Sequence, residues 1–166
     1  MKSNTKKLTI TALFTALICV ATFLVKIPTP AVGGYIHMGD AFVILSGIVL
    51  GPLGSIASAL GSALADLVSG YALYMPITFV IKGIMALITG IIWYKNTSKS
   101  RNNFVRCILC GVIAALIMVG GYLGFELIIY GKAAFLNVPF NLIQGLSGIV
   151  VSAISLPLVY KIFKLK

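Results

Sequence analysis

The sequence predicts an all-α integral membrane protein, a six-transmembrane-helix bundle with both termini in the cytoplasm. Hydrophobic residues make up 60% of the 166-residue chain, charged residues only 10%, and the mean hydropathy is +1.09. Soluble domains contain about 25% charged residues, and a soluble fold of this length would leave much of its apolar surface in water. We therefore expect a single membrane domain over residues 1–166.

The positions of the basic residues predict how the helices are oriented. Thirteen Lys and Arg residues against three Asp and Glu residues give a net charge of +10. Ten of the thirteen lie in three clusters between long apolar runs: Lys2, Lys6 and Lys7; Lys95, Lys99, Arg101 and Arg106; Lys161, Lys164 and Lys166. Cytoplasmic loops of membrane proteins are enriched in such residues. A nucleic-acid-binding surface would interleave its cations with aromatic and hydrogen-bonding side chains, so we expect no nucleic acid as a partner.

The first expected helix, 8–25, is close to the roughly 20 residues that cross the hydrocarbon core. Its apolar stretch is longer than the core of a signal peptide and no clear cleavage site follows it, so we expect it to be retained. The next segment, 26–40, is rich in Pro and Gly and too polar to span. It is expected to be the first outer loop.

Two short apolar segments follow, 41–50 and 55–69, joined by the sequence GPLG. We interpret them as the second and third helices with a tight turn between them. A re-entrant pair is the alternative, because length alone does not distinguish the two arrangements.

The remaining helices are expected over 74–94, 107–130 and 139–163. A basic inner loop, 95–106, separates the fourth helix from the fifth, and a short loop, 131–138, precedes the last. Four spans before the basic loop place all three basic clusters on one side of the membrane, in agreement with their expected cytoplasmic location.

Small residues recur at four-residue spacing in several helices, as in Ala12 with Ala16 and in Ala57, Gly61 and Ala65. Such stripes allow helix backbones to approach closely in lipid. Packing inside the bundle accounts for most of them. The stripe at Ala12 and Ala16 could instead face a partner protein.

Ionisable side chains inside a membrane are costly and tend to mark function. The expected outer halves of the helices contain Asp66, Glu126 and Lys82, the last about 12 Å from the outer end of its helix at 1.5 Å per residue. The inner halves contain no charge except at helix ends. This asymmetry predicts a polar pocket open to the outside, as a binding site for a small external solute requires. A channel would need polar groups as far as the inner face.

The candidate ligand-binding residues belong to the outer loop and to the outer halves of the helices. They are Lys82, Asn141, Gln144, His37, Glu126, Tyr35, Tyr74, Thr78, Asp40 and Tyr122. Asn141 and Gln144 share one helix face, and their amides can donate and accept hydrogen bonds toward a heterocycle.

Each of these assignments has a structural alternative. Lys82 could pair with Asp66 or Glu126 without touching a ligand. Asp40 directly precedes the second helix and could be its N-cap. The outer tyrosines could be anchors at the membrane interface.

Signatures of catalysis, metal binding and nucleotide binding are missing from the sequence. HExxH, GxSxG and P-loop motifs are absent. The pair Cys107 and Cys110 lies in an apolar run without a second pair or a nearby His, so a buried structural role is expected. We expect neither an enzyme nor a cofactor, and any uphill transport must be energised by other proteins.

The sequence GGYIHMGDAFVILSGIVLGPLGSIASALGSALADLVSGY over 33–71, followed by YMPITFVIKGIMALITG over 74–90, resembles the substrate-binding S components of energy-coupling factor (ECF) transporters. Within that family it is most similar to members assigned to pyridoxine or the thiamin pyrimidine precursor, and to the riboflavin-type group. The resemblance covers essentially the whole chain.

The resemblance implies a vitamin-binding subunit in the cell membrane of a prokaryote. It implies that the first outer loop and the outer halves of helices four to six bind the vitamin. Its partners would be a transmembrane T component, contacted by a stripe that Ala12 and Ala16 match, and two ATPase subunits. Pyridoxine or hydroxymethylpyrimidine is the favoured ligand and riboflavin the next. A stand-alone channel or facilitator, and a structural or assembly protein without a ligand, are the alternative functions.

Overall fold

The computed structural model describes residues 4–29, 34–95 and 103–163. In that part of the chain it contains six α-helices, two short β-strands and two 3-10 segments: α1 (Asn4–Leu24), β1 (Lys26–Pro28), β2 (Tyr35–His37), α2 (Gly39–Leu50), η1 (Gly51–Leu53), α3 (Gly54–Val68), α4 (Met75–Lys95), α5 (Asn103–Tyr130), η2 (Gly131–Asn137) and α6 (Val138–Phe163). Five members of the predicted basic clusters lie outside the described residues: Lys2, Lys99, Arg101, Lys164 and Lys166.

Four stretches of the described chain are long and apolar enough to cross a membrane. They are Asn4–Leu24, Gly39–Val68, Met75–Lys95 and Asn103–Phe163. The second stretch contains α2 and α3, and the fourth contains α5 and α6. Large apolar side chains also cover the outside of the bundle, with Ile128 82% exposed and Leu8 71% exposed. The protein is therefore an all-α membrane protein that crosses the bilayer more than once.

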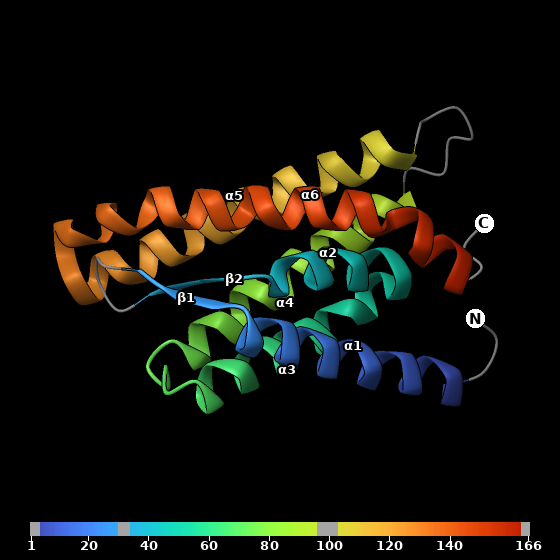
Figure 1. Ribbon diagram of the computed structural model, residues 1–166, viewed down its shortest axis with the longest axis horizontal. Helices are drawn as coiled ribbons and strands as arrows, with labels where there is room; N and C mark the ends of the chain where they lie inside the picture. The colour runs from blue at the N-terminus through green and yellow to red at the C-terminus, as the bar shows by residue number, and fades with distance from the viewer. Residues whose placement is uncertain (1–3, 30–33, 96–102, 164–166) are drawn as a thin grey trace.

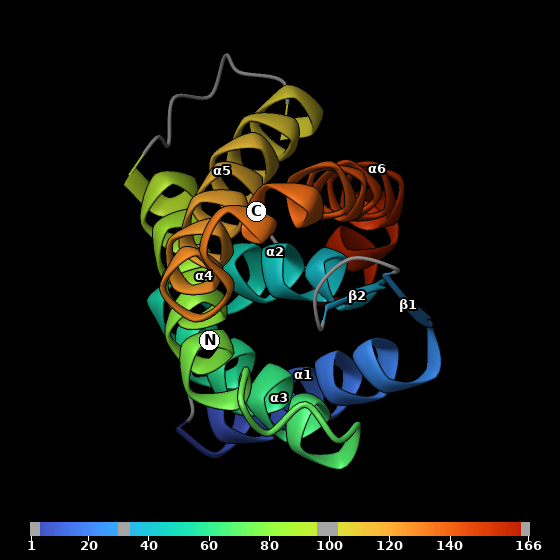
Figure 2. The same ribbon diagram turned by 90° about the vertical axis from the view of Figure 1, so that its left-hand side faces the viewer.

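Helix α2 lies at the centre of the bundle. Eleven of its twelve residues are buried, and it packs against α1, α3, α4 and α6. Viewed along the bundle, α1 and α3 lie on one side of α2, and α5 and α6 lie on the other (Figure 2). The core around α2 includes Ile44, Ile48, Met85 and Met118, each at most 2% exposed.

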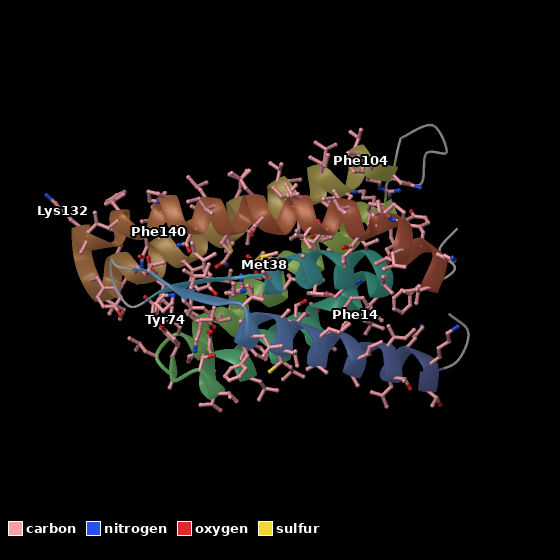
Figure 3. All side chains as sticks on the ribbon, viewed as in Figure 1. Phe14, Met38, Tyr74, Phe104, Lys132 and Phe140 are labelled. Atoms are coloured by element: carbon pink, nitrogen blue, oxygen red, sulfur yellow. The ribbon has the colours of Figure 1, made fainter. Side chains whose placement is uncertain are left out.

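The segment expected to be an irregular outer loop contains a β-hairpin. Strands β1 and β2 pair antiparallel, with Ile27 opposite Ile36. Helix α2 begins near the middle of the long axis, where Met38 lies in Figure 3, and the hairpin extends from there toward one end (Figure 1). A chain segment that enters a membrane bundle needs partners for its backbone polar groups, and strand pairing provides them. The segment predicted to be the first outer loop therefore contains a strand pair that the sequence analysis did not predict.

Glycine allows two backbones to touch where α4 crosses η1. A Cβ atom at Gly90 would overlap the backbone of Gly51, and Gly51 itself has φ +64°. The stripe at Gly61 also packs inside the bundle, because a Cβ there would lie 2.6 Å from the carbonyl oxygen of Thr15 in α1. In contrast, Ala12 and Ala16 are exposed on the surface of α1.

The two ends of the bundle differ in which segments they contain. The start of α1, the end of α4, the start of α5 and the end of α6 lie together at one end (Figure 1). The opposite end contains the α3–α4 connection and η2, with Lys132 at its tip (Figure 3). We call this second end the pocket end.

Candidate ligand-binding site

A pocket of about 420 Å³, including the part that opens to the outside, occupies the pocket end of the bundle. Tyr74 and Phe140, both labelled in Figure 3, are in its wall. The described residues that line it are Thr29, Gly34, Tyr35, His37, Asp66, Tyr71, Tyr74, Thr78, Tyr122, Glu126, Asn137, Phe140, Asn141 and Gln144. These residues come from the hairpin, from helices α3 to α6 and from η2, so segments distant in the sequence meet at the pocket.

One wall of the pocket is formed around Asp66, near the C-terminal end of α3. The Tyr35 hydroxyl donates a hydrogen bond of 2.5 Å to Asp66 Oδ1. The Tyr35 ring lies 4.5 Å from the ring of Tyr71, centroid to centroid, and Lys26 Nζ lies 5.9 Å and 5.7 Å from those two rings. Asp66 is 4% exposed, and its Oδ2 is buried without a hydrogen-bond partner in the part of the chain that the structure describes. The hairpin is thereby joined to α3 through one oxygen of this carboxyl group.

A second carboxyl group, Glu126 on α5, is held in the same way. Its Oε1 accepts hydrogen bonds from the Tyr74 hydroxyl at 3.1 Å and from Asn137 Nδ2 at 2.9 Å. Glu126 is 2% exposed, and its Oε2 is buried without a hydrogen-bond partner among the described residues. Tyr74 directly precedes α4 and Asn137 belongs to η2, so Glu126 joins three segments at the pocket end.

Helices α4 and α5 are also joined by a pair of hydroxyl groups in the pocket wall. Thr78 Oγ1 and the Tyr122 hydroxyl lie 3.0 Å apart, and either can be the donor. The Tyr122 ring extends toward the bundle centre, where Lys82 Nζ lies 5.5 Å from its centroid.

Beneath the pocket lies an ion pair that we call the floor pair, Lys82 and Asp40. Lys82 Nζ donates to Asp40 Oδ1, and Lys82 is fully buried. Gln144 Nε2 donates to Asp40 Oδ2 at 2.9 Å, and the Sδ of Met118 lies 3.3 Å from Lys82 Nζ. A buried charge is tolerated only when it is paired and hydrogen-bonded, and both oxygens of Asp40 meet that condition.

The floor pair corrects two structural alternatives that the sequence left open. Lys82 pairs with neither Asp66 nor Glu126. Asp40 is not an N-cap, because the cap position is Met38 and no side-chain cap bond forms there. The reason is that α2 starts before Asp40, which turns the carboxylate toward α4 rather than back toward the helix end. Neither Lys82 nor Asp40 is among the described residues that line the pocket.

Gln144 connects the floor pair to the pocket wall. Its Nε2 binds Asp40, its Oε1 accepts from the backbone N–H of His37 at 3.1 Å, and the residue also lines the pocket. Asn141, one helical turn earlier, lines the pocket as well, and no hydrogen bond of its side chain to another described residue is found. The two amides therefore lie on one face of α6. Gln144 connects Asp40 to His37, whereas Asn141 lines the pocket without such a connection.

His37 lies at the inner end of the hairpin and is 6% exposed. Its Nδ1 accepts a hydrogen bond from the backbone N–H of Gly39 at 3.1 Å. An Nδ1 atom that accepts a hydrogen bond carries no proton, so this is the geometry of a neutral imidazole.

The structure brings eight of the ten candidate residues into the pocket wall: Tyr35, His37, Tyr74, Thr78, Tyr122, Glu126, Asn141 and Gln144. Sequence reasoning missed Thr29 and Asn137, whose side chains meet at 3.4 Å. Both lie in segments expected to be loops, where a polar residue is ordinary, so composition could not distinguish them. A group of three or more metal-ligating side chains is not found within the described ranges.

Three comparisons with known proteins bear on this site and fold. The sequence model of a family described as "ECF-type riboflavin transporter, S component" matches residues 2–162. An uncharacterised protein of Pyrococcus woesei is 38% identical over 136 residues, covering 81% of this chain and 88% of its own length. A protein of Lactococcus lactis subsp. cremoris, the thiamine precursor transporter HmpT, is 28% identical over 159 residues, covering 94% and 89%.

The fold has a solved counterpart. The crystal structure of the S component for biotin from an ECF-type ABC transporter superposes with a TM-score of 0.69 at 18% sequence identity. The match covers 100% of this chain and 96% of that one. At this identity the likeness concerns the fold.

Proposed function

The chain belongs to the family of ECF-type riboflavin transporter S components, and from this premise we propose that it is the binding subunit for uptake of a small water-soluble vitamin or vitamin precursor. One observation carries the proposal. All three acidic side chains of the chain, Asp40, Asp66 and Glu126, lie at or beneath a pocket at one end of the bundle. Ionisable groups inside a membrane are costly, and their collection around a pocket is what a ligand site requires.

We propose six transmembrane spans in a single membrane domain over residues 1–166, with both termini in the cytoplasm. The described cations support this orientation. Lys6, Lys7, Lys95, Arg106 and Lys161 lie near helix ends at the end of the bundle opposite the pocket. Lys and Arg are enriched on the cytoplasmic side, so the pocket faces outward. Helix α2 is about 18 Å long at 1.5 Å per residue, and the β1–β2 hairpin extends the crossing that α2 alone does not complete.

The favoured ligand is pyridoxine or hydroxymethylpyrimidine, with riboflavin next. The relative named as a thiamine precursor transporter supports a pyrimidine ligand, and the family description names riboflavin.

We propose that the eight lining residues predicted from the sequence contact the ligand and that the floor pair acts through Gln144. The Asn141 amide lies at the pocket wall and makes no hydrogen bond to another described side chain or backbone group, and the rings of Tyr74 and Tyr122 offer apolar faces beside hydroxyl groups. Lys82 and Asp40 hold Gln144 in place from below. A binding site whose polar groups are held rigidly before the ligand arrives loses less entropy on binding.

We propose a transmembrane T component and two ATPase subunits as the partners that energise uptake. The exposed pair Ala12 and Ala16 on α1 supports a helix–helix contact with the T component, because small residues allow close approach in lipid. The chain itself carries no nucleotide-binding motif.

The test is the identity of the small molecule that travels with the protein. The full chain, purified in detergent from its host, is denatured and its bound molecules are identified by mass spectrometry. Titration calorimetry with hydroxymethylpyrimidine, pyridoxine and riboflavin then measures affinity. Tight binding of one of them supports the proposal. Absence of any bound or binding vitamin overturns it in favour of a structural protein.

The facilitator alternative is tested by the partners. Tagged protein should co-purify with a T component and ATPase subunits, and uptake into cells should stop when the ATPase subunits are deleted. Uptake that continues without them would identify a stand-alone facilitator.

A further inference from the structure

Two carboxyl groups in the pocket wall share an unusual arrangement. Asp66 and Glu126 each use one oxygen to accept hydrogen bonds from protein side chains, while the other oxygen is buried and has no hydrogen-bond partner among the described residues. Both residues line the same pocket and come from different helices.

We propose that Asp66 and Glu126 form an acceptor pair that selects ligands presenting N–H donors, such as an amino group or a protonated ring nitrogen, and rejects ligands presenting a carboxylate. The inference rests on the proposed function and specifies the chemistry of its ligand.

The bonded oxygens orient the two carboxyl groups. Tyr35 holds Asp66, and Tyr74 with Asn137 holds Glu126. A carboxylate has acceptor capacity on both oxygens, so each group retains unused capacity on a fixed atom. Leaving a buried acceptor unsatisfied costs about 1–3 kcal/mol, and more when the group is charged. A ligand that brings N–H groups to Oδ2 of Asp66 and Oε2 of Glu126 removes that cost.

The charge balance of the pocket points in the same direction. The described lining residues include two carboxyl groups and no Lys or Arg. Lys82 lies beneath the pocket and is already paired with Asp40. His37 accepts the Gly39 N–H through Nδ1, which is the geometry of a neutral imidazole. Nothing in the described wall therefore compensates a negatively charged ligand group, whereas a cationic or amino-bearing ring meets two acceptors.

An amino-substituted pyrimidine meets this requirement, because its exocyclic amine carries two N–H donors. A pyridine that is protonated at its ring nitrogen meets the same requirement with one N–H donor. A vitamin that carries a carboxylate, such as biotin, would bring a like charge toward Asp66 and Glu126 in a site of low dielectric, where repulsion is strong.

The experiment compares ligands that differ in one group. Detergent-purified full-length protein, freed of bound ligand, is titrated with 4-amino-5-hydroxymethyl-2-methylpyrimidine, with the analogue lacking the amino group, and with the analogue whose hydroxymethyl group is oxidised to a carboxylate. If pyridoxine is the ligand that binds, the matching donor-free analogue is the compound in which CH replaces the ring nitrogen. We expect loss of the donor to weaken binding at least about tenfold, the effect of leaving a buried acceptor unpaired. The carboxylate analogue should bind more weakly still.

Two isosteric variants test the residues themselves. In Asp66→Asn and Glu126→Gln the amide can replace only part of the acceptor capacity and removes the negative charge, so both the donor preference and the rejection of the carboxylate analogue should shrink. Ser152→Ala on α6 is the control and should leave both ratios unchanged, because Ser152 is not among the described lining residues and its hydroxyl interacts instead with Cys107 and the Ile149 carbonyl.

The outcomes separate this inference from the proposed function. A protein that binds one of the vitamins but does not distinguish it from its donor-free analogue overturns the acceptor pair and leaves the function standing. A protein that binds none of them overturns both. The ratios measured on the unmodified protein decide the question even if a variant does not fold.

Discussion

Lys82 on α4 donates a hydrogen bond to Asp40 at the start of α2, forming a fully buried ion pair beneath the pocket. The two residues are 42 positions apart in the sequence. The pair joins the central helix to one of its neighbours, and Gln144 extends it to α6 and the hairpin. The pair therefore positions Gln144, a lining residue of the pocket, relative to α2 and α4.

Breaking the floor pair should destabilise the protein strongly. Lys82→Met leaves the carboxylate of Asp40 buried without its cation, and loss of one partner of a buried ion pair costs about 3–5 kcal/mol. Thermal unfolding in detergent measures the loss. The double variant Lys82→Met with Asp40→Asn should recover much of it, since no isolated charge remains. The exposed Lys132→Met, which should change stability by less than about 0.5 kcal/mol, is the control. Lys82→Met protein as stable as the wild type would contradict the assignment.

Ligand affinity should also report on the floor pair. Asp40 bonds both Lys82 and Gln144. Loss of Lys82 therefore leaves Asp40, and with it the Gln144 side chain, less firmly positioned. We expect Lys82→Met to weaken ligand binding by about tenfold, or about 1.4 kcal/mol, measured by calorimetry at a temperature where the variant is folded. Unchanged affinity would show that the floor pair stabilises the bundle without serving the pocket.

The stripe on α1 should matter for transport and not for binding. Ala12→Leu with Ala16→Leu adds bulk to an exposed face remote from the lining residues, so vitamin uptake by cells should be abolished while the affinity of the purified protein is unchanged. Gly120→Leu with Gly124→Leu is the control, because these residues have the same spacing on α5, are exposed and have open space around them. Uptake unaffected by the α1 substitutions would contradict a T-component contact there.

The close approach of α4 to η1 should not tolerate a side chain. Gly90→Ala places a methyl group on the backbone of Gly51, and overpacking of this kind costs about 1–3 kcal/mol. Gly120→Ala, on an open helix face, should be neutral or slightly stabilising because Ala is the better helix former. Unfolding temperatures of the two variants give the comparison, and equal values would mean that the crossing relaxes without cost.

Much of the architecture was predictable because membrane helices are specified locally. Each long apolar run must satisfy its own backbone hydrogen bonds in lipid, so composition and length predict helices without knowledge of their neighbours. The hairpin was not predictable on the same basis, since Lys26–Pro28 and Tyr35–His37 are too short and too polar to show a strand pattern. They pair because the bundle surrounds them.

By itself, the sequence determined that the chain resides in a membrane, and it indicated that the few polar groups within the helices gather in one half of the bundle. Both properties follow from the transfer energies of individual residues. Only the tertiary structure decided which groups meet. It paired Lys82 with Asp40, and within the described ranges it left one oxygen each of Asp66 and Glu126 without a hydrogen-bond partner. Such pairings depend on the relative rotation and depth of helices distant in sequence, which close contacts such as that of Gly90 with Gly51 set and which no local pattern encodes.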